Sequence, residues 1–405
     1  MLKRYFLNYK IRNFSTALIW IKGGSDMDIA NKRGLNKILS SLLIRGCEGF
    51  ENFELSEYIE SYGAELNQEI CEDGILISIK SLNEHFRKLL PLLDLIVNKP
   101  ILSKIEFQKV KKSSLNLIKK DKENPFNICF EKWKKIVYSS HPYAFNAIGN
   151  EIDVSNITYE DVLNEFEKFK LREKYIISNN LEANSENLEI VNKKITKENS
   201  IQINNNLDSM RRFDYVCNDS NQTIILIGNQ TCPRRSKDYL PLKVFESYLS
   251  FGMTGALFKL FREKNGITYD LGVFNPIRSK NAPFLVYLSV SNKNAIFAFE
   301  LLSSLWKNLL LTKLLDEEIY LAKEKLKGSF LLGRQSIDDI LHRKIKLISF
   351  GIKSISENDI YLKIDEISSL EIFKLTNKYF SKPFLSISGN KKICSEIKDI
   401  WNKNF

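Results

Sequence analysis

Apolar and polar residues alternate at period two in several short stretches of the chain. The clearest are residues 15–22 (STALIWIK), 74–81 (GILISIKS) and 283–291 (PFLVYLSVS). This alternation is typical of β-strands. Residues 34–46 follow another pattern, because their apolar positions recur at intervals of three and four. They predict a helix with one buried stripe that ends at Gly46.

The order of these elements is repeated along the chain. The strand at 74–81 is followed by two helical segments, and so is the strand at 283–291. The repeated order of strand, helix, short break and helix indicates an internal duplication. Because the helices come in pairs, the pattern favours an α+β fold of two homologous two-layer half-units. Each is expected to be an antiparallel-rich sheet with paired helices on one face.

A polar, asparagine-rich stretch separates the two halves. Between residues 182 and 206 the chain has few large apolar residues, which is typical of a linker. The expected organisation is therefore an N-terminal half-unit at 1–190, a linker at 191–206 and a C-terminal half-unit at 207–405.

Composition narrows the class of protein. With 405 residues, 43% of them hydrophobic, the chain can fill two or three cores. No apolar run approaches the roughly 20 residues that a membrane span needs, and the N-terminus has no obvious export signal. We therefore expect a cytoplasmic protein without a membrane span. The six cysteines include no C-x-x-C pair, which is typical of reduced thiols.

The formal net charge of +11 raises the question of a nucleic-acid partner. No nucleic-acid-binding motif accompanies it, so a solvated basic surface is the favoured interpretation and no nucleic acid is expected as a partner. The three histidines lie far apart, which argues against a self-contained zinc site. Asp338 and Asp339 are interpreted as the solvated start of a helix.

Five stretches stand in an order and spacing that one known family shares. They are IKGGSDMD (21–28), GLNKILSSLLIRG (34–46), IESYGAELNQEICEDGILISI (59–79), HPYAFNAIGNEIDVSNITYEDV (141–162) and FGMTGALFKLFREKNGITYDLG (251–272). Together they resemble the insulinase/pitrilysin peptidases, which include mitochondrial processing peptidase. The resemblance runs from about residue 16 to at least residue 335.

The resemblance implies a zinc site that this chain has lost. In active family members, the helix that corresponds to 34–46 carries the motif H-x-x-E-H, with two zinc-binding histidines and a glutamate as general base. The matching positions here are Lys37, Ser40 and Ser41, and the family's third ligand, a glutamate, falls on Leu117. These residues are poor zinc ligands, so we expect no metal or cofactor in this chain. Two interpretations of the Lys37 side chain are open: a pair with an acidic group in the vacated site, and a solvated lysine on the helix surface.

A second family element is retained at Arg262 and Tyr269. Active members supply an arginine and a tyrosine, seven residues apart, that face the zinc across the substrate cavity. A guanidinium and a phenol are suitable donors to the carbonyl of a bound peptide and to the oxyanion that develops from it. The structural alternative is an exposed helix residue near Glu263 and an ordinary strand aromatic.

The resemblance therefore implies the non-zinc subunit of a heterodimeric zinc peptidase. Its partner would be a zinc-bearing homologous subunit, and the pair would enclose unfolded peptides, with Arg262 and Tyr269 acting in trans at the partner's zinc. On this interpretation the chain alone is inactive. Two alternatives are open, namely a catalytically inactive scaffold of the same fold and a module that binds peptides without cleaving them.

Overall fold

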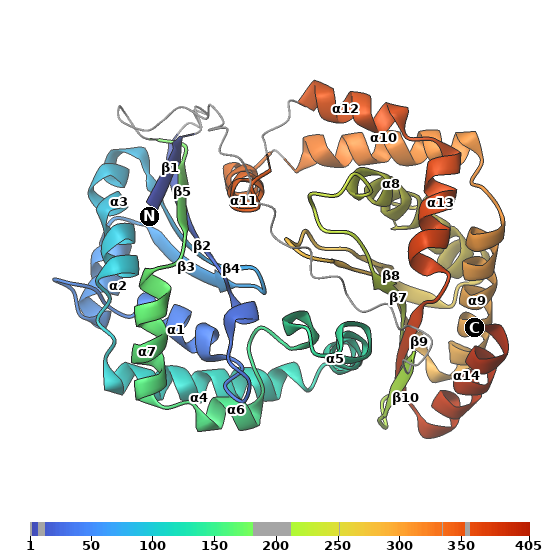
Figure 1. The fold of residues 1–405 in the computed structure, drawn as a ribbon, viewed down its shortest axis with the longest axis horizontal. Helices are drawn as coiled ribbons and strands as arrows, with labels where there is room; N and C mark the ends of the chain where they lie inside the picture. Colours follow the sequence, from blue (N-terminus) through green and yellow to red (C-terminus); the bar gives the residue numbers. More distant parts are fainter. Residues whose placement is uncertain (1, 7–12, 181–211, 251, 334, 353–356) are drawn as a thin grey trace. The chain divides into compact units, whose positions relative to one another are not determined.

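The computed structural model describes residues 2–6, 13–180, 212–250, 252–333, 335–352 and 357–405 (Figure 1). These residues form two compact units. Those within 1–121, 145–198 and 333–354 belong to the first unit, and those within 122–144, 199–332 and 355–405 belong to the second. Each unit contains one five-stranded sheet and its own apolar core.

The sheet of the first unit has the strand order β1-β5-β2-β4-β3. The strands are Leu2–Phe6 (β1), Phe14–Lys22 (β2), Glu65–Ile70 (β3), Gly74–Leu82 (β4) and Lys174–Ser178 (β5). The β1–β5 pair is parallel, and the other neighbours are antiparallel. β3 is an edge strand, because β4 is its one partner among the described strands.

The helices of the first unit include those that carry the predicted site. They are η1 (Ser25–Met27), α1 (Leu35–Leu43), α2 (Asn52–Ser61), α3 (Asn83–Asn98), α4 (Lys104–Asp121), α6 (Glu151–Asn156), α7 (Tyr159–Lys170) and α11 (Ile337–Ser349). Ala17, Ile19 and Ile21 of β2 belong to the core that α1 and α3 share with the sheet. The intervening residues Leu18 and Trp20 are also buried, so β2 is covered on both faces.

The sheet of the second unit repeats the first in order and direction. Its order is β6-β10-β7-β9-β8, with β6–β10 parallel and the other pairs antiparallel. The strands are Phe213–Cys217 (β6), Gln222–Gln230 (β7), Thr268–Phe274 (β8), Pro283–Ser291 (β9) and Phe384–Gly389 (β10). The predicted duplication and the predicted α+β class are confirmed.

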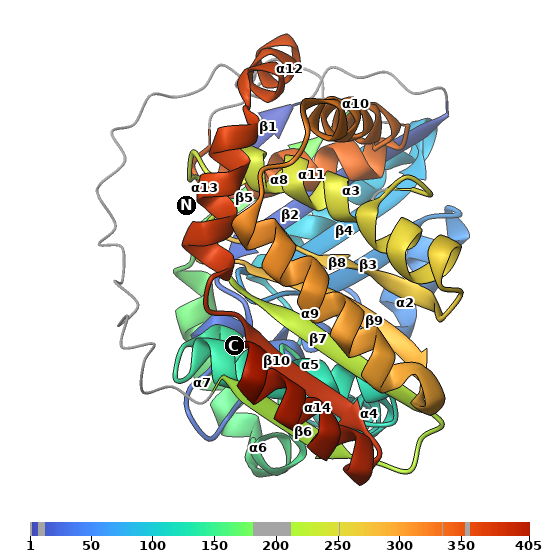
Figure 2. The same ribbon diagram turned by 90° about the vertical axis from the view of Figure 1, so that its right-hand side faces the viewer.

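Helices stack on one face of this second sheet, where α9, α13 and α14 lie across β7, β9 and β10 (Figure 2). The helical segments of the unit are α5 (Pro125–Tyr138), η2 (Pro142–Ala144), α8 (Tyr239–Ser250), the π-helix η4 (Phe258–Lys264), η5 (Asn292–Asn294), α9 (Ala295–Leu311), α10 (Asp316–Leu332), α12 (Glu357–Glu366), α13 (Ser369–Phe380) and α14 (Lys391–Asn404).

One helix of each compact unit comes from the other half of the sequence. α5 ends at Tyr138, far before β6 begins at Phe213. It nevertheless packs on β6, β7 and β10, and Trp133 Nε1 donates to the Phe384 carbonyl oxygen at 3.3 Å. α11 follows most of the second unit but packs on β2 and β5 of the first. The compact units therefore differ from the sequence halves in these two segments, and the predicted linker at 191–206 lies outside the described residues.

α11 is held on the first sheet by Asp338. Its carboxylate accepts hydrogen bonds from Thr16 Oγ1 and Lys80 Nζ, both at 2.8 Å. The expected helix start at Asp338 and Asp339 is confirmed, and Asp339 is exposed, but Asp338 is half-buried and bonded to a sheet distant in sequence instead of being solvated. Asp338 fixes that contact through its two carboxylate oxygens.

No single helix in the described part of the chain has both the length and the apolar composition of a membrane span. One pair, Asn292–Leu311 and Asp316–Leu332, meets both measures only when the two are joined across a bend of 105°.

Candidate functional site

α1 carries three of the four positions that the resemblance assigns to the family's zinc site, namely Lys37, Ser40 and Ser41. The loop before α1 fixes where the helix begins. Gly34 has φ +98°, and a Cβ there would lie 2.8 Å from both the Ile148 carbonyl oxygen and Val154 Cγ2. Asp28, which precedes the helix by several residues in sequence, accepts hydrogen bonds from N–H groups at its N-terminus. Its Oδ2 accepts from the Gly34 N–H at 2.7 Å, and its Oδ1 accepts from the main-chain and side-chain N–H groups of Asn36, both at 2.9 Å.

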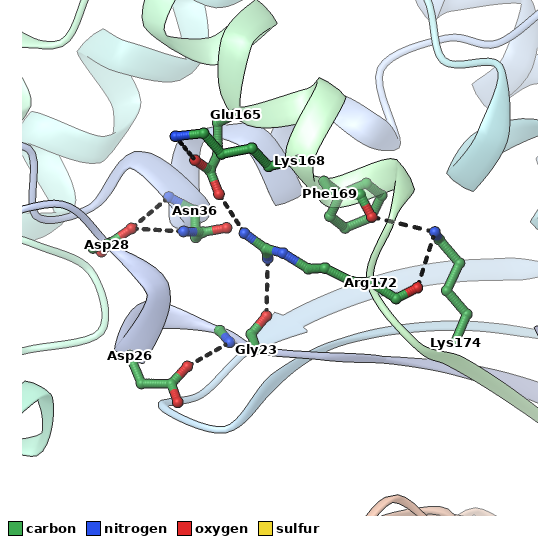
Figure 3. Close-up of polar contacts among 10 residues, drawn as sticks. Gly23, Asp26, Asp28, Asn36, Glu165, Lys168, Phe169, Arg172 and Lys174 are labelled. Atoms are coloured by element: carbon green, nitrogen blue, oxygen red, sulfur yellow. Dashed lines mark hydrogen bonds and ion pairs between the residues drawn. The ribbon is translucent and has the colours of Figure 1, made fainter. Parts of the chain in front are cut away.

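A buried ion pair lies beside this loop (Figure 3). Arg172 pairs with Glu165 of α7, and the two side chains are only 7% and 3% exposed. The Arg172 guanidinium also donates to the Gly23 carbonyl oxygen at 3.0 Å. Because each buried charge depends on its partner, this contact ties the loop at 23–28 to the end of α7 and so supports the start of α1.

Burial shifts the pKa values of the acids in this region. It raises the pKa of Asp28 to about 6, although the hydrogen bonds from Asn36 and Gly34 act in the opposite direction. Burial also raises the pKa of Glu165, and the positive charge of Arg172 partly offsets this effect. Both acids are almost fully enclosed, so they serve as supports of the site and not as groups that meet a ligand.

Lys174 supports the same region from the first residue of β5. Its Nζ donates to the Phe169 carbonyl oxygen at 3.2 Å, at the end of α7 (Figure 3). It also donates to the Lys170 carbonyl oxygen at 2.8 Å. A cation is favourable at a helix C-terminus, where carbonyl groups lack intrahelical partners. Burial lowers the pKa of Lys174, and the carbonyl oxygens stabilise its charged form.

Lys37, Ser40 and Ser41 gather around one side chain of the edge strand β3, Gln68. Gln68 Oε1 accepts from Lys37 Nζ at 3.3 Å and from Ser41 Oγ at 3.5 Å, and Gln68 Nε2 donates to Ser40 Oγ at 2.8 Å. Ser40 Oγ donates in turn to the main-chain carbonyl of Lys37 at 2.9 Å. We call these four residues the Gln68 cluster. Ser40 is buried and the other three are half-buried.

Leu117 stands apart from these hydrogen bonds. It lies on α4, which packs against α1, and its side chain is 47% exposed. A hydrocarbon side chain neither binds a metal nor joins a polar network. The structure therefore unites three of the four predicted positions, and the Gln68 cluster gains a member that sequence reasoning missed.

The Gln68 cluster does not fit zinc. Zinc in proteins is bound by thiolate, imidazole or carboxylate groups, and the Gln68 cluster offers an amine, two hydroxyls and an amide. Both ends of the Gln68 amide are already hydrogen-bonded within the protein. Across the described ranges, no group of three or more His, Cys, Asp or Glu residues is arranged to hold a metal ion.

Arg262 lies on a π-helix in the second unit. The π-helix spans Phe258–Lys264, and the Arg262 side chain is exposed, with its guanidinium carbon 5.1 Å from the centre of the Phe258 ring. Gly266, at φ +61°, ends the segment, and its N–H donates to the Arg262 carbonyl oxygen at 3.1 Å. The structural alternative considered for Arg262 was an exposed helix residue, and the residue lies on a π-helix.

Tyr269 lies at a break in the pairing of the edge strand β8. Thr268 pairs with Val290, while Asp270 pairs with Ser289. Two neighbouring residues of β9 therefore oppose three residues of β8, so Tyr269 is the extra residue of a β-bulge. The predicted roles of Arg262 and Tyr269 stay predictions.

Two domain models of peptidase family M16 match the chain. The model described as Insulinase (Peptidase family M16) matches residues 6–151, and the one described as Peptidase M16 inactive domain matches residues 173–326. Together these matches span well over half of the chain. The chain belongs to the insulinase family of metallopeptidases. The first match contains the Gln68 cluster, and the inactive-domain match contains Arg262 and Tyr269.

Two relatives align with nearly the whole chain. An uncharacterized zinc protease of Rickettsia felis is 23% identical over 369 residues, which cover 89% of this chain and 88% of the relative. A protein of the same description from Rickettsia bellii is 21% identical over 372 residues, with the same coverage of 89% and 88%.

Two solved structures share the fold. A peptidase M16 inactive domain from Pseudomonas fluorescens aligns with a TM-score of 0.78 at 18% identity, and the match covers 95% of both chains. A protease from Helicobacter pylori aligns with a TM-score of 0.79 at 15% identity, covering 93% of this chain and 94% of the other. Both agree with the two homologous half-units predicted from the sequence.

Proposed function

We propose that this insulinase-family chain is the non-zinc subunit of a two-subunit peptidase. It holds unfolded peptides, and a zinc-bearing homologous partner supplies the metal chemistry that cleaves them. The observation that carries the proposal is the Gln68 cluster. The apolar residues of α1 are fully buried in the core, so the helix is kept, while its polar positions bond to one another and offer no zinc ligand.

The edge strand β3 supports peptide binding. An edge strand presents unpaired main-chain N–H and C=O groups, to which an extended peptide can add as a further strand. Leu66, Gln68 and Ile70 are half-buried and alternate with the exposed residues Glu65 and Glu69. A peptide on β3 would therefore lie directly beside the Gln68 cluster.

The backbone around Arg262 and Tyr269 supports a role on the same peptide. π-Helical turns are rare and frequent at functional sites, and β-bulges often re-aim a side chain next to an active site. Each of the two residues lies on one of these irregularities. In the proposed pair, the Arg262 guanidinium and the Tyr269 hydroxyl donate hydrogen bonds to the peptide that the partner cleaves.

The isolated chain is expected to bind far less than one zinc ion per molecule. The reason is the donor set of the Gln68 cluster, which lacks thiolate, imidazole and carboxylate groups. Elemental analysis of protein purified without chelators measures the metal content, and the same analysis of the assembled pair is the control. About one tightly held zinc ion in the isolated chain would contradict the proposal.

The decisive test of the proposed function is a mixing experiment. The chain is combined with an insulinase-family subunit from the same cell that retains H-x-x-E-H, and cleavage of an unfolded peptide is followed. We expect cleavage by the mixture that exceeds the sum of the separate subunits, together with a complex of both chains on a sizing column. Chelator-sensitive cleavage by this chain alone would overturn the proposal. A complex whose activity equals that of the partner alone would favour the scaffold.

A further inference from the structure

Lys37 differs from another half-buried lysine of the first unit in having no acidic partner. Lys80, which is 39% exposed, pairs with the Asp338 carboxylate at 2.8 Å. In the part of the chain that the structure describes, no carboxylate oxygen lies within 4.0 Å of Lys37 Nζ. Its hydrogen bond goes instead to the neutral amide oxygen of Gln68, at a long 3.3 Å.

This arrangement leaves a positive charge incompletely balanced. Burial lowers the pKa of Lys37, and no neighbouring charge acts against that effect. A partly buried ammonium group is stabilised by an anion that approaches it closely. Lys37 also has three N–H donors, of which the bond to Gln68 uses one.

A second donor stands next to this charge. The Ser41 hydroxyl is half-buried and donates to Gln68 Oε1 at 3.5 Å, which is at the outer limit for a hydrogen bond. It can turn to a stronger acceptor at little cost. Gln68 holds both donors through one oxygen atom, and Ser40 fixes the other end of the same amide. The Gln68 cluster thus presents an ammonium and a hydroxyl that are both short of a good acceptor.

The position of Gln68 on β3 determines which side chains of a peptide bound to this strand can contact the Lys37 and Ser41 donors. Side chains alternate between the two faces of a strand, and directly opposed residues on paired strands have Cβ atoms about 4.5–5.5 Å apart. A strand added to the free edge of β3 would place every second side chain on the Lys37 face of the sheet. Neutral or positive side chains suit the other face, where Glu65 and Glu69 are exposed.

We propose that Lys37, Ser41 and Gln68 form a binding site for a carboxylate carried by an extended peptide on the edge of β3. The proposal rests on the proposed function in one respect, namely that a peptide binds along this edge. The Lys37 ammonium and the Ser41 hydroxyl donate to the carboxylate, and Gln68 orients both. The carboxylate is either the C-terminus of the peptide or an aspartate or glutamate side chain.

Peptide binding by the full chain tests this site. Labelled peptides share one neutral, extended sequence with an amidated C-terminus. The first peptide keeps this neutral sequence, and the second has a free C-terminal carboxylate. The third and fourth each carry one aspartate, at adjacent central positions. Two aspartate positions are needed because only every second side chain of a bound strand faces Lys37. Fluorescence anisotropy at about 0.15 M salt gives the dissociation constants, since this salt screens the attraction of a basic surface for any acidic peptide. We expect at least one carboxylate form to bind about tenfold or more tightly than the neutral form.

Two lysine variants assign that preference to its site. Lys37→Met removes the charge and is expected to abolish the preference, while Lys119→Met removes an equal charge from the exposed surface of α4 in the same unit and is expected to keep it. Unchanged melting temperatures show that both variants fold. A preference that persists in Lys37→Met would overturn the carboxylate site.

The other outcomes of the peptide-binding experiment distinguish a failure of the carboxylate site from a failure of the proposed function. Equal binding of all four peptides would overturn the carboxylate site and leave peptide binding intact. No binding of any peptide would overturn both. A preference for the free C-terminus alone identifies a terminal carboxylate as the ligand, and a preference for one aspartate position identifies a side chain.

Discussion

Replacing Arg172 with methionine is expected to lower the free energy of unfolding by about 3–5 kcal/mol. The variant leaves the Glu165 carboxylate, 3% exposed, without its buried partner. Lys168 is the other cation near it, at 3.8 Å, but that side chain is 63% exposed and compensates weakly. The Gly23 carbonyl oxygen also loses its hydrogen bond from the guanidinium. Urea titrations followed by far-UV circular dichroism measure the loss.

The deficit of the Arg172 variant is expected to depend on pH. Burial already raises the pKa of Glu165, and the Arg172 charge acts against that effect, so removing Arg172 raises the pKa further. A carboxyl with a higher pKa in the folded state than in the unfolded state binds its proton more readily when folded. Stability then falls as pH rises through the two values. The deficit should therefore be smaller near pH 5 than near pH 8.

A second substitution serves as the control for this interpretation. Glu165→Gln added to Arg172→Met removes the unpaired charge, so it should restore a large part of the lost stability and remove most of the pH dependence of the deficit. An Arg172→Met variant that unfolds at the same urea concentration as the parent would show that the ion pair is not needed to hold the loop at 23–28 against α7.

The sheets and α1 could be predicted because their patterns are local. Period-two alternation placed β4 and β9 almost to the residue, at Gly74–Leu82 and Pro283–Ser291. The apolar stripe of 34–46 placed α1, which the structure has at Leu35–Leu43. In each case one face of the element packs against a core. The apolar residues therefore recur with the period of that element, which is two residues in a strand and about 3.6 in a helix.

The exchanged helices could not be predicted, because nothing local distinguishes them. α5 and α11 have amphipathic sequences that suit any apolar surface, and each packs on a sheet formed by the other half of the chain. The same uncertainty made Asp338 look like a solvated residue. Its two partners, Thr16 and Lys80, are more than 250 residues away in sequence, and a one-dimensional pattern does not contain that pairing.

The sequence contains a weak indication that Gln68 belongs to the site. Leu66 and Ile70 occupy the same face of β3, so a polar residue between them breaks the apolar alternation of that face. Such a break is typical of a side chain with polar partners across the layer. The family resemblance located Lys37, Ser40 and Ser41, but only the structure showed that Gln68 is the residue they share.

The π-helix at Arg262 and the β-bulge at Tyr269 could not be predicted from the sequence for another reason. Both are insertions of one residue into an otherwise regular element. The amino-acid composition of the segment does not indicate such an insertion. The sequence could supply the two residue types and their spacing. The structure added that each lies on irregular backbone, which is an independent reason to test them.

In the reconstituted pair, Arg262→Ala and Tyr269→Phe are each expected to lower turnover by roughly a hundredfold to a thousandfold. Loss of one donor to a developing oxyanion costs about 2.7–4 kcal/mol of transition-state stabilisation. Tyr269→Phe removes only the hydroxyl, so its effect should fall on turnover. Arg262→Ala should also raise KM, because a guanidinium can hold carbonyl groups along a peptide.

The controls for this last prediction separate catalysis from assembly. Lys264→Ala removes an exposed cation from the same π-helix and should leave turnover near the parent value. Assembly, melting temperature and the zinc content of the pair should be unchanged in all three variants, because none of them alters a proposed metal ligand. If Arg262→Ala and Tyr269→Phe both cleave at the parent rate, the two residues are ordinary parts of the fold. The inactive scaffold would then be the better account of this chain, because a subunit that contributes no donor to the substrate needs only its surface and its partner.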